Sequence, residues 1–114
     1  MRALLLFVVA ALGWAQSKPG AAPSGDAQNG RKIFTSYGCY QCHGYDGHGG
    51  AGARLVPMKL MLPVFTAYVR SPRQMPAYRA KVMSDAELAD VWVYLKTIPE
   101  SPPAKSIALL EELR

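Results

Sequence analysis

Two cysteines and a histidine lie within five residues, in the run Cys39-Tyr40-Gln41-Cys42-His43. Two thiols at this spacing can add across the two vinyl groups of a haem, while the histidine that follows becomes an axial ligand of the iron. The chain contains two cysteines in all, so this run uses its full thiol content. The pattern therefore predicts one covalently attached haem c, held by Cys39, Cys42 and His43.

Two other kinds of site also use a Cys-x-x-Cys pair. A redox disulfide of the thioredoxin type needs a strand-helix-strand setting, which the residues around this run lack. A structural zinc site usually takes four ligands, and beyond Cys39, Cys42 and His43 the remaining good candidate is His48, without the usual paired spacing. Both alternatives stay open, with haem as the favoured hypothesis.

A second axial ligand would distinguish electron transfer from ligand binding, because an open iron position can bind exogenous molecules. The candidates are Met58, Met61, Met75, Met83 and His48. His48 follows His43 by five residues, a reach of about 17 Å when fully extended, which rounding a haem edge would nearly exhaust. Met75 precedes Pro76, and a proline holds the preceding residue in an extended conformation that suits a loop laid against a face. We predict that Met75 is the second ligand, that the reduction potential is positive, and that the other three methionines pack in the core or at its rim.

Helical patterns flank the cysteine run on both sides. Asp26 is a plausible N-cap for a short helix over residues 27–37, which Gly38 ends. Pro63 suits the first turn of a second short helix, and Pro72 stops it. Residues 43–57 contain five glycines and no period, which predicts an irregular loop.

The clearest helix is predicted over residues 85–97. Ser84 and Glu87 have the spacing of a capping box, and apolar residues then recur at helical intervals, at Leu88, Val91, Trp92 and Leu95. No segment alternates convincingly as a strand. We therefore expect an all-α domain in which three main short helices wrap one haem.

The ends of the chain differ in composition from its middle. Residues 1–15 have a basic start, the apolar run Ala3–Leu12 and small residues around Ala15, which predicts a signal peptide and a periplasmic location. An uncleaved leader would instead tether the protein to a membrane. Residues 16–25 are rich in Pro, Gly, Ala and Ser and indicate a flexible linker. The domain is expected over residues 26–99, and residues 100–114 form an extension with room for one short helix over Ile107–Leu113.

Length and charge exclude several functions. A chain of 114 residues, 50% hydrophobic and 18% charged, holds one domain rather than a multidomain enzyme. It contains no run long enough for a stable membrane span once the leader is removed. The net charge of +5, or +4 without Arg2, is too small to indicate nucleic-acid binding.

The chain resembles the small bacterial class I cytochromes c over about Asp26 to Pro99. The resemblance rests on features in a fixed order: Gly30 and Phe34, the Cys39–His43 run, Gly44, Asp46-Gly47, Gly49, Gly52, Met75-Pro76, and Val91 to Leu95. It implies a cytochrome c-like fold in which the first and last helices cross at right angles. Gly30 would allow their close approach, and Phe34 would meet Tyr94.

The resemblance also implies roles around the haem. Pro57 resembles the proline whose carbonyl accepts the Nδ1–H of the axial histidine, which would fix the ring of His43. Arg54 resembles a residue that pairs with a haem propionate. Tyr78 and Trp92 could line the propionate side, but they are interpreted first as packing residues.

Function follows from the resemblance as an expectation. The leading hypothesis is a one-electron carrier without catalytic residues; a cytochrome c subunit of a larger dehydrogenase or oxidase, using the C-terminal extension as a contact, is the alternative. A ligand-binding haem enzyme or sensor is disfavoured because Met75 can close the site.

No acidic residue lies between Gly47 and Ser84, whereas six basic residues do: Arg54, Lys59, Arg70, Arg73, Arg79 and Lys81. This basic rim predicts redox partners with acidic docking surfaces.

Overall fold

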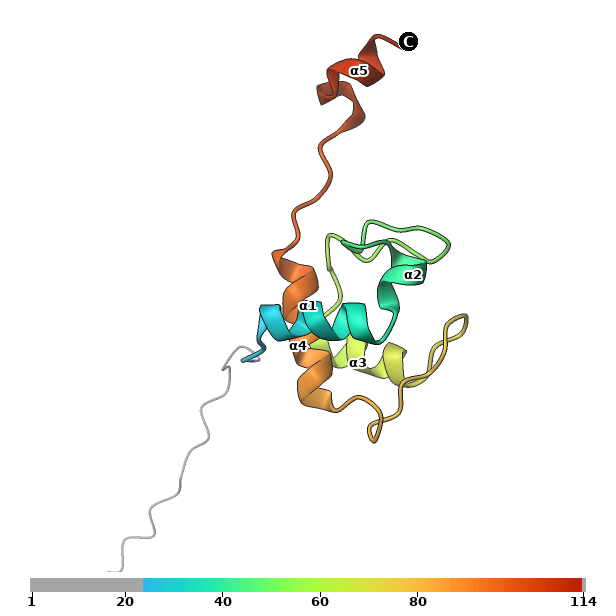
Figure 1. The fold of residues 1–114 in the computed structure, drawn as a ribbon, viewed down its shortest axis with the longest axis vertical. Helices are drawn as coiled ribbons and strands as arrows, with labels where there is room; N and C mark the ends of the chain where they lie inside the picture. The colour runs from blue at the N-terminus through green and yellow to red at the C-terminus, as the bar shows by residue number, and fades with distance from the viewer. Residues whose placement is uncertain (1–23, 114) are drawn as a thin grey trace, which may run out of the picture.

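The computed structural model describes residues 24–113, in which helices and loops occur without any strand (Figure 1). The helical elements are α1 (Ala27–Ser36), α2 (Cys39–His43), α3 (Leu62–Arg70), α4 (Asp85–Thr97), the 3-10 turn η1 (Ala104–Ser106) and α5 (Ala108–Glu111). The all-α class and the three main helices, α1, α3 and α4, are confirmed. The predicted leader and residues 16–23 of the predicted linker lie outside the described residues.

The central packing contact is the crossing of α1 over α4 (Figure 1). A Cβ atom at Gly30 would lie 2.0 Å from the carbonyl oxygen of Asp90, so the absence of a side chain lets the two backbones touch. The rings of Phe34 and Tyr94 meet beside this crossing, with centroids 5.7 Å apart and tilted by 58°. Both expectations for this contact, the close approach at Gly30 and the Phe34–Tyr94 pair, are confirmed.

Polar contacts fix the start of α1 against α4. The Asp26 carboxylate accepts hydrogen bonds from the backbone N–H groups of Gln28 and Asn29, at 2.8 and 3.1 Å, as an N-cap should. The Asp90 carboxylate on α4 accepts from the Asp26 N–H and from the Asn29 side-chain amide, both at 2.7 Å. Asp90 therefore ties the first turn of α1 to the middle of α4.

Helix α4 has the predicted bounds and the predicted cap. Ser84 Oγ accepts from the Glu87 N–H at 3.2 Å, and the Glu87 carboxylate accepts from the Ser84 N–H at 2.6 Å. These reciprocal bonds satisfy two donors that a helix start would otherwise leave open.

One core joins α1, α3, α4 and the loops on either side of α3. Its buried side chains are Ile33, Phe34, Val56, Met58, Phe65, Val69, Met83, Leu88, Val91, Tyr94 and Leu95. Met58 and Met83 belong to it, as predicted, whereas Met61 is 69% exposed at its rim.

The C-terminal arm, residues 100–113, extends away from this body (Figure 1). Within it α5 contacts η1, and neither packs against α1, α2, α3 or α4. The predicted helical turns over Ile107–Leu113 are present in part, because the α-helix covers Ala108–Glu111. Among residues 24–113, no helix has both the length and the apolar character that crossing a membrane requires.

Candidate haem site

The cysteine run forms a helix of its own, α2, directly after α1. Gly38 connects the two helices with φ of 77°, a left-handed conformation that glycine adopts without steric cost. Because α2 is one turn long, Cys39 and Cys42 lie on the same side of it, with His43 next to Cys42.

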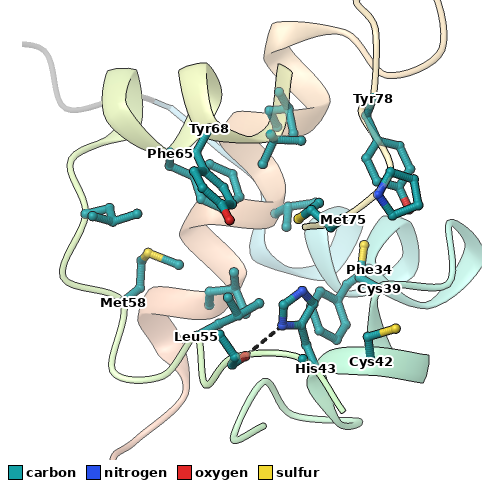
Figure 2. A pocket seen from close by; sticks show the side chains of 18 of the residues that line it. Phe34, Cys39, Cys42, His43, Leu55, Met58, Phe65, Tyr68, Met75 and Tyr78 are labelled. Atoms are coloured by element: carbon teal, nitrogen blue, oxygen red, sulfur yellow. Dashed lines mark hydrogen bonds between the residues drawn. The ribbon is translucent and has the colours of Figure 1, made fainter. Parts of the chain in front are cut away.

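These three side chains face an apolar cavity of about 460 Å³ (Figure 2). The opposite walls come from α3, α4 and the two loops that flank α3, with Leu55, Phe65, Val69, Leu88 and Leu95 among the apolar side chains. A hollow of about 160 Å³ adjoins it and shares Cys39, Cys42, His43, Met75 and Tyr78 in its lining. His43, at the end of α2, and Met75, in the loop after α3, thus reach one continuous space (Figure 2).

The orientation of the His43 ring is set by a backbone carbonyl. Nδ1 of His43 lies 2.7 Å from the carbonyl oxygen of Ala53, the bond drawn dashed in Figure 2. The prediction that Pro57 supplies this carbonyl is wrong, and Pro57 does not line the cavity. The glycine-rich loop returns over the ring sooner than expected, so Ala53 reaches Nδ1, while Pro57 comes after the buried Val56.

Glycines make this early return possible. The Gly52 N–H donates to the Cys42 carbonyl at 2.7 Å, and the Gly49 N–H donates to the His43 carbonyl at 2.9 Å. A Cβ atom at Gly52 would lie 3.1 Å from Nδ1 and Cε1 of His43 and 3.1 Å from the Cys42 carbonyl oxygen. The loop can therefore lie against the ring because it presents no side chain there.

The loop that carries Met75 is anchored through Tyr78, at the edge of the cavity near Cys39 (Figure 2). Tyr78, three residues after Met75, donates its N–H to the Val69 carbonyl at 3.2 Å and its hydroxyl to the Tyr37 carbonyl at 3.0 Å. Tyr37 in turn donates its hydroxyl to the Val82 carbonyl at 2.9 Å. The loop is thus tied to α3 and to the corner between α1 and α2, beside the cysteines.

Arg70 belongs to this anchor rather than to a free basic rim. Its guanidinium donates to the Tyr78 carbonyl at 2.6 Å and to the Asp85 carboxylate at 2.5 Å, and its side chain is 20% exposed. Arg70 therefore does not stand free in the basic rim, because one arm of its guanidinium holds the Met75 loop at Tyr78 and the other pairs with Asp85 at the start of α4. Among the other basic residues of the rim, Arg54, Lys59, Arg73, Arg79 and Lys81 are exposed.

Three further residues considered from the sequence have defined places. Arg54 lines the cavity, and its Nε donates to the His48 carbonyl at 3.2 Å. Tyr78 lines the cavity as well, whereas the Trp92 Nε1–H donates to the Leu60 carbonyl at 2.8 Å and pins the start of α3 to α4. His48 is absent from the cavity lining, and its ring lies against Pro99.

The thiol environment bears on the two alternatives to haem. Burial raises the pKa of the Cys39 thiol above its ordinary value, whereas the reactive thiol of a Cys-x-x-Cys oxidoreductase has a lowered pKa. Within residues 24–113, no group of three or more His, Cys, Asp or Glu side chains is arranged to hold a metal ion. The raised pKa of Cys39 is therefore opposite in direction to that of a reactive oxidoreductase thiol.

The same residues suit a haem. The site combines an apolar cavity in the size range of cofactor sites, two thiols on one turn of helix and an imidazole. The Nδ1 of this imidazole is held by a carbonyl, which leaves Nε2 for an iron. Gly52 leaves the space beside the ring that a side chain would fill.

Sequence reasoning missed two contributors, Ala53 and Gly52. Ala53 acts through its carbonyl, so no side-chain pattern could identify it. Gly52 was noted within the glycine-rich loop, but its place against the His43 ring depends on how that loop folds.

Comparison with known proteins matches the chain to a protein family. The family model of cytochrome c oxidase, cbb3-type, subunit III covers residues 25–95, which include the cysteine run, the glycine-rich loop and Met75. No curated protein and no solved structure matches the chain.

Proposed function

We propose that this chain, a small monohaem cytochrome c that belongs to the family of cytochrome c oxidase, cbb3-type, subunit III, is a one-electron carrier. His43 and Met75 would be the axial ligands of its haem iron. Cys39 and Cys42 would hold the haem through two thioethers. When bound, the haem iron supplies a couple that gains and loses one electron. The remaining roles belong to the side chains and loops of the protein.

One observation carries the proposal: His43 and Met75 point into one cavity, and each is held by a separately anchored loop (Figure 2). The Ala53 carbonyl keeps a proton on Nδ1 of His43 and so directs Nε2 toward the iron position. Arg70 and Tyr78 hold the Met75 loop to α3. Because both loops are anchored, the protein around the haem needs to rearrange little when the iron gains or loses an electron. This rigidity favours electron transfer.

A redox titration of the haem-loaded protein tests this assignment. With a thioether opposite an imidazole, the midpoint should be positive and the curve should follow a one-electron slope of about 59 mV per decade. A clearly negative midpoint would count against Met75 as the ligand.

Location and partners are part of the proposal. The basic start and apolar run of residues 1–15 support export to the periplasm. The exposed cations Arg54, Lys59, Arg73, Arg79 and Lys81 support docking on acidic surfaces. Electron-transfer rates with such a partner should fall as the salt concentration rises, and rates that stay constant would remove this part of the proposal.

A second candidate function is that of a subunit in an oxidase complex. The name of the family supports it, and so does the C-terminal arm, where Leu109 and Leu113 are 67% and 78% exposed. The discriminating experiment is purification from native membranes of the full chain and of a variant ending at Ser101. Co-purification of oxidase activity with the full chain alone would favour the subunit role, and its absence from both would favour the free carrier.

A further inference from the structure

His48 links the glycine-rich loop to the end of α4. Its Nε2 lies 3.1 Å from the Pro99 carbonyl oxygen, and its Nδ1 lies 3.0 Å from Oδ1 of Asp46. Nδ1 is shielded from solvent and makes no aligned hydrogen bond, so its contact with Asp46 is one of charge. The side chain of His48 is 22% exposed.

Both groups that face the ring are acceptors. A neutral imidazole carries one proton, so one tautomer would direct a lone pair at the Pro99 oxygen, and the other would leave an unprotonated Nδ1 3.0 Å from the Asp46 carboxylate. The imidazolium can donate from Nε2 to the Pro99 carbonyl and at the same time places its positive charge beside the Asp46 carboxylate. The geometry therefore suits the protonated ring.

The backbone of His48 reaches the haem site. Its carbonyl accepts from Nε of Arg54, which lines the cavity, and the next residue, Gly49, donates its N–H to the His43 carbonyl at 2.9 Å. Ala53, which holds Nδ1 of His43, immediately precedes Arg54. Any loosening of His48 would therefore reach the groups that orient the axial histidine.

We propose that His48 is a positioning residue for the haem site, whose imidazolium clamps the loop over residues 44–54 to the end of α4. With the clamp closed, the loop holds Ala53 and Arg54 against the cavity. Loss of the proton as the pH rises removes one of the two contacts and loosens the loop. The effect on the loop is independent of the proposed function, whereas the effect on reduction potential rests on it.

The charged groups around the ring are consistent with this direction. The ring of His48 and its backbone N–H lie against the Asp46 carboxyl and lower the pKa of that group, so the carboxylate stays ionised below its usual range. Arg54 meets the backbone of His48 rather than its ring. On the α4 side, Lys96 lies over the Trp92 ring, 4.6 Å from its centroid, and Glu100 follows Pro99 in the chain. The contacts of the ring with Pro99 and Asp46 thus predict that the clamp holds at low pH and loosens as the pH rises.

Amide hydrogen exchange in the reduced, haem-loaded full chain tests the clamp directly. The reporters are the N–H groups of Gly49 and Gly52, which bond to the carbonyls of His43 and Cys42. Their protection factors, corrected for the intrinsic pH dependence of exchange, should fall about two- to five-fold from pH 5.5 to 8, the range expected for partly exposed ion pairs. Protection that is constant over this range would overturn the proposal.

Two variants separate the clamp from plain packing. His48→Gln keeps an amide that can donate to Pro99 but does not titrate, so its protection should be flat with pH. Asp46→Asn keeps an oxygen that can accept from the backbone N–H of His48, which donates to Asp46 Oδ1 at 3.3 Å. The variant removes the carboxylate charge, so the fall in the protection factors with rising pH should be smaller. A variant His48→Gln that retains the full pH dependence would contradict the role of His48.

The reduction potential supplies the second readout. If the clamp orients His43, the midpoint of the native chain should shift with pH over the interval in which the loop loosens, and that shift should be absent in His48→Gln. An identical shift in both proteins would contradict the link to the site. If Met75 were not the axial ligand, the reduction potential would be lower than expected at every pH, whereas the amide exchange results would be unchanged.

Discussion

At the scale of single residues, the chemistry of His43 depends on neighbours that contribute backbone rather than side chains. Nδ1 is held by the Ala53 carbonyl, and Gly52 lies against the ring because it has no Cβ atom. The cysteine run could be interpreted from the sequence because its chemistry resides in side chains at fixed spacing. Pro57 was assigned by resemblance, and the assignment failed because a carbonyl contact depends on the path of the loop.

Gly52→Ala should therefore destabilise the haem-loaded protein. The added Cβ would lie 3.1 Å from the His43 ring and from the Cys42 carbonyl oxygen, so either the ring or the loop must shift. We expect a loss of about 1–3 kcal/mol in the free energy of unfolding, the usual cost of overpacking, measured by guanidinium denaturation. Ala53→Ser keeps the carbonyl at an exposed position and is the control, and equal losses in both variants would contradict the account.

Met75→Leu should lower the reduction potential. Leucine preserves the volume of the side chain but has no sulfur to offer the iron, so the ligand field that raises the potential is lost. Met61→Leu is the matched control, because Met61 is 69% exposed at the rim of the core. Redox titration of both variants checks the assignment, and a potential that falls in neither would show that Met75 is not a ligand.

At the scale of elements, local signals determined the helices and long-range contacts determined the loops. The N-caps Asp26 and Ser84 and the apolar period of residues 88–95 predicted α1 and α4 to within one residue at each end. The anchoring of the Met75 loop could not be predicted, because Arg70 and Tyr78 find their partners across the fold. Arg70 was assigned to a free basic rim, since sequence shows a charge but not its partner, here Asp85.

Gly30→Ala should weaken the crossing of α1 and α4. Its Cβ would lie 2.0 Å from the Asp90 carbonyl oxygen, a backbone atom that cannot move without separating the helices. Alanine is the better helix former, so an exposed site would gain stability, whereas here we expect a loss of about 1–3 kcal/mol or more. Lys32→Ala on the exposed side of α1 is the control in guanidinium denaturation. Unchanged stability of the Gly30 variant would show that the helices do not touch there.

At the scale of the whole molecule, the body and the C-terminal arm are separate. The body, from Asp26 to Pro99, contains the core and the cavity, while α5 and η1 pack against none of its helices. The sequence predicted this division from the prolines at 99, 102 and 103. It could not predict the cavity, which several distant segments build together.

A chain that ends at Ser101 should therefore keep its stability. Pro99, which His48 contacts, is retained, and no described contact between the arm and the helices of the body is lost. We expect the thermal midpoint of the haem-loaded protein to change by less than about 2 °C, as surface changes away from packed features usually do. A large fall in the midpoint would mean that the arm packs on the body.

The most direct test of the central claim is the optical spectrum of the haem-loaded protein, oxidised and reduced, with and without carbon monoxide. We predict a low-spin c-type spectrum that carbon monoxide leaves unchanged, because His43 and Met75 fill both axial positions. A shift on adding carbon monoxide would contradict it, since the sixth position would then be open and the protein would be a ligand-binding haem protein rather than a carrier.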